Sequence, residues 1–312
     1  MLKKKIVVVS LLAVVFVGSA GYFTYQRYQQ IKIKRLALEK KKALWQALEL
    51  AVSEQMSQFQ GEAGVILKDL DTDWQIAVNK TKSFPSASLA KIPIMASCFY
   101  AVFQGKIKLQ DELILKERHK VLGSGTLKTM AAGRRVSIEN LIERMITESD
   151  NTATNMLIEL LGYEYMNSCF KEFGLKDTSL ARKMMEFKLR RKGVENYTTA
   201  EDVALLLEKM YRKEVVNVVF SERCLSLLKQ QKIKDRIPAL LPPEVVIAHK
   251  TGLERHVCHD AGIVFSPGGN FLLCVLTSHT DKTSKRAKEF IARLAFEAYR
   301  YFTEFTMEEH TI

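Results

Sequence analysis

The chain of 312 residues has few cysteines, and it lacks the patterns in which cysteine performs chemistry. The five cysteines are scattered, with no CxxC pair and no grouping with histidine at metal-ligand spacing. They are Cys98, Cys169, Cys224, Cys258 and Cys274. This absence argues against a thiol-based metal centre, and no metal or other cofactor is predicted. We expect mostly buried small hydrophobes; one disulfide stays open in an oxidising compartment, but the sequence does not pair the residues.

Acidic residues are almost absent from the first 45 positions. Ten Lys or Arg stand there against Glu39 alone, so these positions carry +9 of the net charge of +12. The remainder, at +3, is nearly balanced and has no nucleic-acid recognition motif, so no nucleic-acid partner is expected. With 47% hydrophobic and 26% charged residues, the chain is long enough for one large globular domain plus an appendage. We expect a monomer.

Charge is also absent from residues 6–23, an apolar run of 18 residues that follows Lys3, Lys4 and Lys5. The run is at the short end for a membrane-spanning helix and exceeds the usual apolar core of a signal peptide. We therefore predict a membrane anchor over residues 1–26. A cleavable signal peptide is the alternative, because residues 18–20 are small, and no cysteine follows to suggest a lipoprotein.

The flanks of this run leave its orientation ambiguous, because basic residues crowd both sides. The chemistry described below places the domain on the extracytoplasmic side of the membrane. Residues 27–46 are predicted to form a basic helical stalk, since no Pro or Gly occurs from 29 to 58 and Leu36, Leu44 and Leu48 recur at helical spacing. Residues 47–312 form the predicted domain.

Short apolar segments at both ends of this domain predict strands. Residues 64–70 and 74–78 read as a hairpin around an acidic turn, and residues 245–252, 261–265 and 270–278 as three further strands. A mainly helical stretch runs between them from about 88 to 232, and a last helix from about 284 to 305. We expect one antiparallel sheet built from distant parts of the chain.

Ser88 and Lys91 form the first motif that carries chemistry, at the start of an apolar helix. Residues i and i+3 share a helix face, so the lysine amine is placed beside the serine hydroxyl. A partly desolvated lysine can exist neutral and accept the serine proton, and a helix N-terminus can stabilise an oxyanion. The alternative is an N-cap serine with a surface lysine. Lys91 is, however, an isolated charge in an apolar run.

Ser149, Asp150 and Asn151 form the second motif, at a break between two apolar helices. There Ser149 can pass a proton to a leaving nitrogen, and the Asn151 amide can bind a substrate carbonyl. The alternative is a purely structural role for this triplet, as a helix N-cap.

Lys250, Thr251 and Gly252 form the third motif, at the end of a strand. Lys250 supplies fixed positive charge, Thr251 a hydroxyl for a substrate carboxylate, and Gly252 room for close backbone approach. The N–H of Leu253 can join that of Ser88 as an oxyanion donor. Without the other motifs, this triplet is too short to indicate a function.

In this order the three motifs resemble the combined signature of class A β-lactamases and penicillin-binding proteins, over residues 47–305. Residues 123–127 and 198–200 add further matches. The resemblance implies an α+β fold: a three-layer α/β/α domain whose antiparallel sheet comes from both ends, with a helical insert. It also implies Ser88 as nucleophile and Lys91 and Ser149 as proton carriers. The implied substrate-binding residues are Asn151, Lys250, Thr251, Gly252 and Leu253.

The sequence departs from this family in the segment 178–200. Class A enzymes release their acyl group with a glutamate in this loop, acting through a water. Alignment on Arg182 puts Met184 at that position; alignment on a Glu-x-x-Leu pattern selects Glu186 instead. The first register fits the unbroken distance to Thr198 better, and Glu186 then pairs with Lys183 or Arg190 in solvent.

Two histidines follow the third motif, His256 and His259, and we expect loop histidines rather than metal ligands because no third ligand is in sight. The leading functional hypothesis is a serine hydrolase that opens β-lactams through an acyl-Ser88 intermediate. A D-alanyl-D-alanine peptidase or transpeptidase-like enzyme acting on peptidoglycan peptides is its rival. A non-catalytic penicillin sensor is the third alternative, although it would need a partner chain for its output.

Overall fold

The computed structural model describes the backbone of residues 2–309 and the side chains of residues 22–304. The chain divides into two compact units, residues 1–50 and 51–312. The first unit lies within helix α1 (Leu2–Gln58), so the helix predicted from residue 29 is confirmed and begins much earlier. In the described part of the chain, no helix has an apolar run long enough to cross a membrane. The predicted anchor, residues 1–26, lies mostly outside the described side chains.

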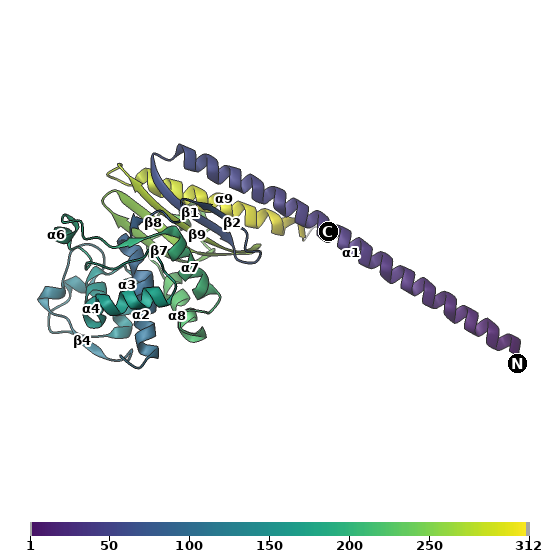
Figure 1. Cartoon of the computed structure of the whole chain (residues 1–312), viewed down its shortest axis with the longest axis horizontal. Coiled ribbons are helices and arrows are strands. Elements are labelled where there is room, and N and C mark those ends of the chain that lie inside the picture. Colours follow the sequence, from purple (N-terminus) through teal and green to yellow (C-terminus); the bar gives the residue numbers. More distant parts are fainter. Residues whose placement is uncertain (1, 310–312) are drawn as a thin grey trace. The chain divides into compact units, whose positions relative to one another are not determined.

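A five-stranded antiparallel sheet is the framework of the second unit, with the order β2-β1-β9-β8-β7 (Figure 1). Its strands are β1 (Gly61–Asp69), β2 (Gln75–Val78), β7 (Val246–Glu254), β8 (Val257–Ser266) and β9 (Gly269–His279). β1 pairs with β9 from Gly61↔His279 to Asp69↔Phe271. This pairing joins the two ends of the domain, so the predicted sheet is confirmed.

The turn between β7 and β8 is shorter than the sequence predicted. β7 continues to Glu254 and β8 begins at Val257, where we expected a loop across 253–260. The polar residues of this segment masked the strand signal, because pairing such as Leu253↔Cys258 is carried by the backbone. His256 turns the chain with φ 68. The prediction that His259 lies in a loop is therefore wrong, because His259 is part of β8.

Helices cover both faces of the sheet, α9 on one and α7 and α8 on the other (Figure 1). The nearly continuous burial of β8 and β9 reflects this cover. The helices are α2 (Lys91–Phe103), α3 (Ile138–Thr147), α4 (Asn151–Leu161), α5 (Tyr163–Glu172), α6 (Phe187–Arg190), α7 (Ala200–Tyr211), α8 (Val218–Lys229) and α9 (Lys285–Glu309). Short 3₁₀ turns are η1 (Ala87–Ala90), η2 (Glu117–His119), η3 (Leu127–Thr129) and η4 (Ile237–Leu240). Short strand pairs join β3 (Phe84–Pro85) to β6 (Tyr197–Thr198) and β4 (Glu112–Ile114) to β5 (Arg135–Ser137).

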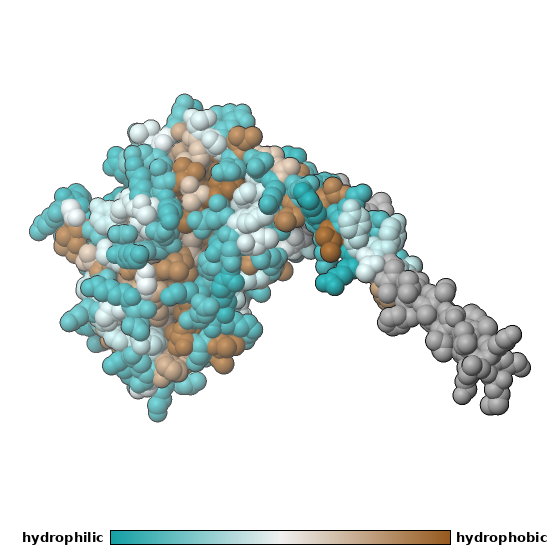
Figure 2. Space-filling view, turned by 45° about the vertical axis from the view of Figure 1, so that its right-hand side comes forward, coloured by the Kyte–Doolittle hydropathy of each residue, from teal (hydrophilic) through white to brown (hydrophobic). Residues whose placement is uncertain are grey.

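The helical insert has a core of its own around α2. Buried residues surround this helix on most sides, which is typical of a central helix. All five cysteines are buried and free, and burial raises the pKa of the thiols, so they pack as small hydrophobes as predicted. On the face shown in Figure 2, hydrophobic residues form separate patches between hydrophilic ones.

Candidate active site

Ser88 sits on the 3₁₀ turn η1, immediately before α2. Ala87, just before it, has a φ of 44, a conformation that costs energy for a residue with a Cβ. Leu89 and Ala90 are buried and fix the turn in the core, whereas Ser88 itself is half-buried. The fold thus presents the Ser88 hydroxyl at the surface of a rigid support.

Lys91 begins α2 and is fully buried. Its Nζ lies 2.6 Å from the Ser149 carbonyl oxygen, 3.1 Å from Ser149 Oγ and 2.8 Å from Asn151 Oδ1. Among the described residues, no hydrogen bond joins Lys91 to Ser88, so the expected direct contact is replaced by contacts to the second motif. Burial, together with the nearby charge of Lys250, holds the pKa of Lys91 well below its usual value.

Ser149 links this lysine to the third motif. Its Oγ lies 3.1 Å from Lys91 Nζ and 3.0 Å from Lys250 Nζ, and the residue is buried. Ser149 also has a φ of 54, a strained value for a non-glycine residue. The structure therefore holds one hydroxyl between two amines, which is the arrangement that a proton relay needs.

Asp150 and Asn151 hold the second motif in place. Asp150 is the N-cap of α4: its carboxylate accepts hydrogen bonds from the N–H groups of Ala153 at 2.9 Å and Leu127 at 2.7 Å. The N-cap interpretation of the triplet is thus confirmed for Asp150. The side chains of Ser149 and Asn151 contact Lys91 instead. Asn151 directs its Oδ1 to Lys91 and its Nδ2 to the carbonyl of Leu122, 3.3 Å away.

Lys250 is fully buried on β7, at the edge of the sheet. Burial lowers its pKa to about 7; the nearby positive charge of Arg236 also lowers it, and Asp260 opposes this effect. Its Nζ donates to Ser149 Oγ and to the carbonyl of Thr251, both at 3.0 Å. Near neutral pH, Lys250 can therefore exist with or without its charge.

The other residues of the third motif lie beside Lys250 on the same strand. Thr251 is buried, whereas the Leu253 side chain is exposed. Gly252 packs closely on His259, since a Cβ on Gly252 would lie 3.1 Å from that ring. The strand thus needs glycine here for its own packing as well as for access to the site.

Arg236 is a site residue that the sequence did not single out. It is buried next to η4, lowers the pKa of Lys250, and its Nε donates to Cys258 Sγ at 3.1 Å. In the sequence it stands among Lys232, Lys234 and Asp235, and no pattern separates it from these surface charges. Only the fold shows that this one cation faces inward.

Met184 and Glu186, the two candidates for the position of the family's glutamate, have different surroundings in the segment 178–197. Met184 is buried, its N–H donates to Asn155 Oδ1 at 2.7 Å, and Asn155 Nδ2 donates back to the Met184 carbonyl at 3.1 Å. Glu186 is half-buried and accepts a hydrogen bond from the backbone N–H of Lys183 at 2.8 Å. Burial and, after it, the charge of Glu186 raise the pKa of Tyr163, a residue outside the three motifs. This geometry favours the register based on Arg182.

His256 and His259 form hydrogen bonds with the backbone of other segments. The Nε2–H of His259 donates to the Pro85 carbonyl at 2.8 Å, and its Nδ1 accepts from the N–H of Thr277 at 3.0 Å. Burial lowers the pKa of His259 to about 4, so it stays neutral. His256 contacts the carbonyl of His279 at the β7–β8 turn. Within residues 22–304, no group of three or more His, Cys, Asp or Glu side chains is placed to hold a metal.

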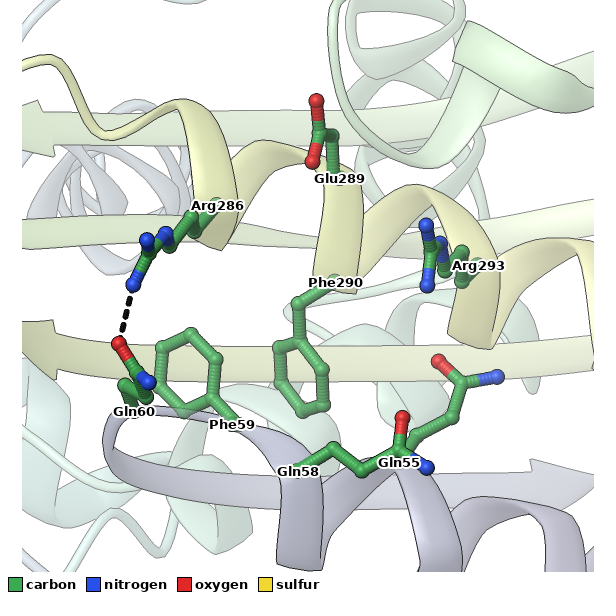
Figure 3. Close-up of a pocket in the computed structure, with 8 residues that line it drawn as sticks. All are labelled: Gln55, Gln58, Phe59, Gln60, Arg286, Glu289, Phe290 and Arg293. Carbon is green, nitrogen blue, oxygen red and sulfur yellow. Dashed lines mark hydrogen bonds between the residues drawn. The ribbon is translucent and has the colours of Figure 1, made fainter.

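A separate cavity of about 240 Å³ lies between the end of α1 and the start of α9 (Figure 3). Phe59 and Phe290 stack across it with ring centroids 4.5 Å apart, and Arg286 donates to Gln60. None of the residues from the three motifs lines this cavity, so it belongs to the packing of α9 rather than to the site around Ser88.

Ser88 follows a strained residue, and behind it a buried lysine of depressed pKa contacts a hydroxyl held between two amines. Set beside an antiparallel sheet, these features are typical of a serine acyl-transfer enzyme. A model of the β-lactamase enzyme family matches residues 46–302, and the chain belongs to this family. The protein is thus a serine hydrolase of the β-lactamase type.

Individual relatives agree with this assignment. The extended-spectrum β-lactamase PER-1 of Pseudomonas aeruginosa is 26% identical over 248 residues, which cover 72% of this chain and 78% of PER-1. The crystal structure of a β-lactamase from Sphaerobacter thermophilus is 27% identical with a TM-score of 0.76, covering 83% of this chain and 97% of that one. A leucine-to-glutamate variant of PBP-A, solved as an acyl-enzyme complex with penicillin G, is 30% identical with a TM-score of 0.75, covering 84% and 97%.

Proposed function

We propose that Ser88 is the nucleophile of an enzyme that opens the amide bond of β-lactams and becomes acylated in the process. The observation that carries this proposal is the position of Ser149 Oγ, which is within hydrogen-bond distance of both Lys91 and Lys250. An arrangement of two buried amines around one hydroxyl gives protons a path through the site. The path begins at Lys91, three residues after Ser88, whose hydroxyl must lose its proton.

Acylation follows from the depressed pKa of Lys91. A neutral amine has two N–H groups and one lone pair, so Lys91 can donate to the Ser149 carbonyl and to Asn151 Oδ1 while its lone pair remains able to take up a hydroxyl proton. The Ser88 proton passes to Lys91 as Ser88 Oγ bonds to the carbonyl carbon. Ser149 then delivers its hydroxyl proton to the ring nitrogen as the C–N bond breaks, and it takes up the proton held by Lys91, which becomes neutral again. The product is an ester on Ser88 and a free amine within the opened ring.

Two groups of residues hold the substrate during this step. The N–H groups of Ser88 and Leu253 stabilise the oxyanion that forms on the carbonyl. Lys250, Thr251 and Gly252 line the strand edge, where a substrate carboxylate meets the charge of Lys250 and the Thr251 hydroxyl. Arg236 adds a second positive charge behind Lys250. Asn151 binds the amide carbonyl of the substrate side chain.

Release of the acyl group lacks its expected base. Met184, which has no proton to exchange, occupies the backbone position that Asn155 fixes, and the Glu186 carboxylate is engaged by Lys183 N–H. We therefore propose that the acyl-enzyme persists much longer than in an efficient β-lactamase. This persistence also favours a second function, a cell-wall D-alanyl-D-alanine peptidase or transpeptidase-like enzyme, in which an amine or water attacks the same ester.

The enzyme is proposed to work at the outer surface of a membrane, attached by residues 1–26. Support comes from the apolar run 6–23 and from the stalk that follows it. Along the described part of α1, exposed aromatic residues such as Tyr22, Tyr25 and Tyr28 occur near basic ones in the sequence, as at membrane interfaces. Protease treatment of intact cells tests this location: digestion of the domain supports it, and full protection contradicts it.

Intact-protein mass spectrometry over time tests the chemistry. After a pulse of benzylpenicillin, we expect an adduct of one intact penicillin per chain that decays slowly. Rapid loss of the adduct with turnover of nitrocefin would instead show an efficient β-lactamase. Release of D-alanine from an acyl-D-alanyl-D-alanine peptide would support the peptidase function. Absence of any adduct would contradict the proposal.

A further inference from the structure

Another cavity, of about 360 Å³, lies at the start of β7 and is separate from the site around Ser88. Its lining comes from the end of α8, from η4 and from the first half of β7, and it includes no residue of the three motifs. Small-molecule sites have volumes of about 300–1,000 Å³. The cavity is therefore large enough for a small ligand.

The walls of this cavity are mainly apolar and partly rigid. Pro238, Pro242 and Pro243 line it, so it contains three of the six prolines of the chain. Further apolar side chains in the lining are those of Leu241, Val245, Val246 and Ile247. Because a proline ring fixes φ, these walls lose little freedom when a ligand binds. The lining thus favours a ligand with an apolar body.

His249 supplies a polar group to the same lining. Its side chain is 3% exposed, and Nδ1 lies 2.9 and 3.1 Å from the two carboxylate oxygens of the buried Asp260. A carboxylate only accepts hydrogen bonds, so Nδ1 carries the ring proton and Nε2 of the neutral ring is an acceptor. Within residues 22–304, no hydrogen bond to this Nε2 is formed. A ligand with an N–H or O–H group would provide the missing donor.

Lys229 and Lys234 add positive charge to the lining. Both are exposed, and in the described part of the chain neither is paired with a carboxylate. Lys229 Nζ lies 4.3 Å from the ring centroid of Phe265, which leaves its charge uncompensated. Glu244 also lines the cavity, so two positive charges stand against one negative charge. A ligand with a single negative charge would balance them.

We propose that this cavity binds a small carboxylic acid that has an apolar body and a hydrogen-bond donor, as an N-acylated amino acid does. The carboxylate meets Lys229 and Lys234, the amide N–H donates to His249 Nε2, and the apolar side chain lies against the prolines. The site is additional to the one around Ser88, and binding to it requires no acylation.

Equilibrium dialysis with N-acetyl-leucine and with the uncharged N-acetyl-leucinamide tests this site. We expect one saturable site per chain and about fivefold tighter binding of the acid, the scale of a favourable exposed ion pair. Lys234→Gln should weaken binding of the acid and leave binding of the amide unchanged, because only the acid pairs with this lysine. Equal affinity for the two probes, or no saturable binding, would overturn the proposal.

Three further variants locate the ligand. Val246→Trp fills the cavity from an exposed position and should abolish binding while the melting temperature is retained. His249→Asn keeps an N–H donor for Asp260 but removes Nε2, and both probes should bind about fivefold more weakly. Lys176→Gln, at an exposed lysine outside the cavity, should change neither affinity.

Binding that survives Val246→Trp would place the ligand elsewhere and overturn the proposal. The measurement involves no β-lactam, so its failure would leave the proposed function of Ser88 untouched. Conversely, failure of the protein to form a penicillin adduct would leave this binding site unaffected.

Discussion

The Met184 backbone and the Asn155 side chain form a reciprocal pair of hydrogen bonds, 2.7 Å and 3.1 Å long. Asn155 lies on α4, four residues after Asn151, so the helix that carries the second motif also fixes the segment 178–197, called the Met184 segment below. A thioether is therefore held where the family's water-activating carboxylate is expected. On the proposed function, this one side chain separates acylation from release.

Met184→Glu should accelerate release of the acyl group. The new carboxylate would stand at the fixed position and activate a water, and a general base of this kind contributes about a hundredfold or more. The measurement is the decay of the penicillin adduct by intact-protein mass spectrometry. Glu186→Gln is the matched control, and it should leave decay unchanged because Glu186 is turned to Lys183 N–H. Faster decay in neither variant would refute this role of position 184.

Asn155→Ala should loosen the Met184 segment. It removes two partners of buried backbone groups, each of which costs about 1–3 kcal/mol when left unsatisfied. We expect a lower melting temperature and faster hydrogen exchange in residues 182–186, with the exchange of β8 and β9 altered only by the global loss of stability. Unchanged exchange in 182–186 would show that the pair does not hold the segment.

The pH dependence of acylation should report Lys250. Its pKa of about 7 means that the positive charge expected at the substrate carboxylate is present below this pH and is lost as pH rises through it. Apparent affinity for penicillin should therefore fall above pH 7. In Lys250→Met this fall should disappear and affinity should be low throughout. Affinity independent of pH between 6 and 9 in the unmodified enzyme would contradict the assignment.

The same lysine affects stability. Its pKa is lower in the folded state than the usual 10.5, so the unfolded chain binds more protons between about pH 7 and 10.5. Lys250 therefore adds a contribution to the free energy of unfolding that rises with pH across this window. Chemical denaturation of the enzyme and of Lys250→Met at pH 7 and pH 9.5 should show the larger rise in the enzyme. An equal rise in both would exclude this contribution.

Gly125→Ala should damage the site beyond the cost of its backbone conformation. Gly125 has a φ of +97, and a Cβ there would collide with the carboxyl group of Asp150. Gly133 has a similar φ of +88 but open space around it, so Gly133→Ala carries the conformational strain alone. We expect slower acylation only in Gly125→Ala. Equal acylation in both variants would show that Asp150 tolerates displacement.

The sequence predicted much of this site because its chemistry is local. Ser88 and Lys91 are three residues apart, and each of the other motifs is contiguous, so order and flanks were enough. The sheet was predicted from the apolar segments at both ends. Arg236 was missed because burial of one cation among several depends on distant packing. The β7–β8 turn was predicted too long because polar residues concealed backbone pairing.

The ion pairs of Arg182 and Arg190 with Glu195 and Glu254 show the same limit. Arg182, Arg190, Glu195 and Glu254 look like solvated charges in the sequence, and Arg190 was considered only as a partner of Glu186. Their meeting depends on how the Met184 segment lies against β7, which local patterns do not encode. Charged residues from distant segments are paired by the fold, and only the structure identifies them.

The central claim, acylation of Ser88, is tested most directly by locating the adduct. The enzyme and Ser88→Ala are each mixed with benzylpenicillin, digested and mapped by tandem mass spectrometry. We predict one penicilloyl group, on the peptide that contains Ser88, and none in Ser88→Ala. A penicilloyl group on another residue, or an adduct of equal yield in Ser88→Ala, would contradict the account.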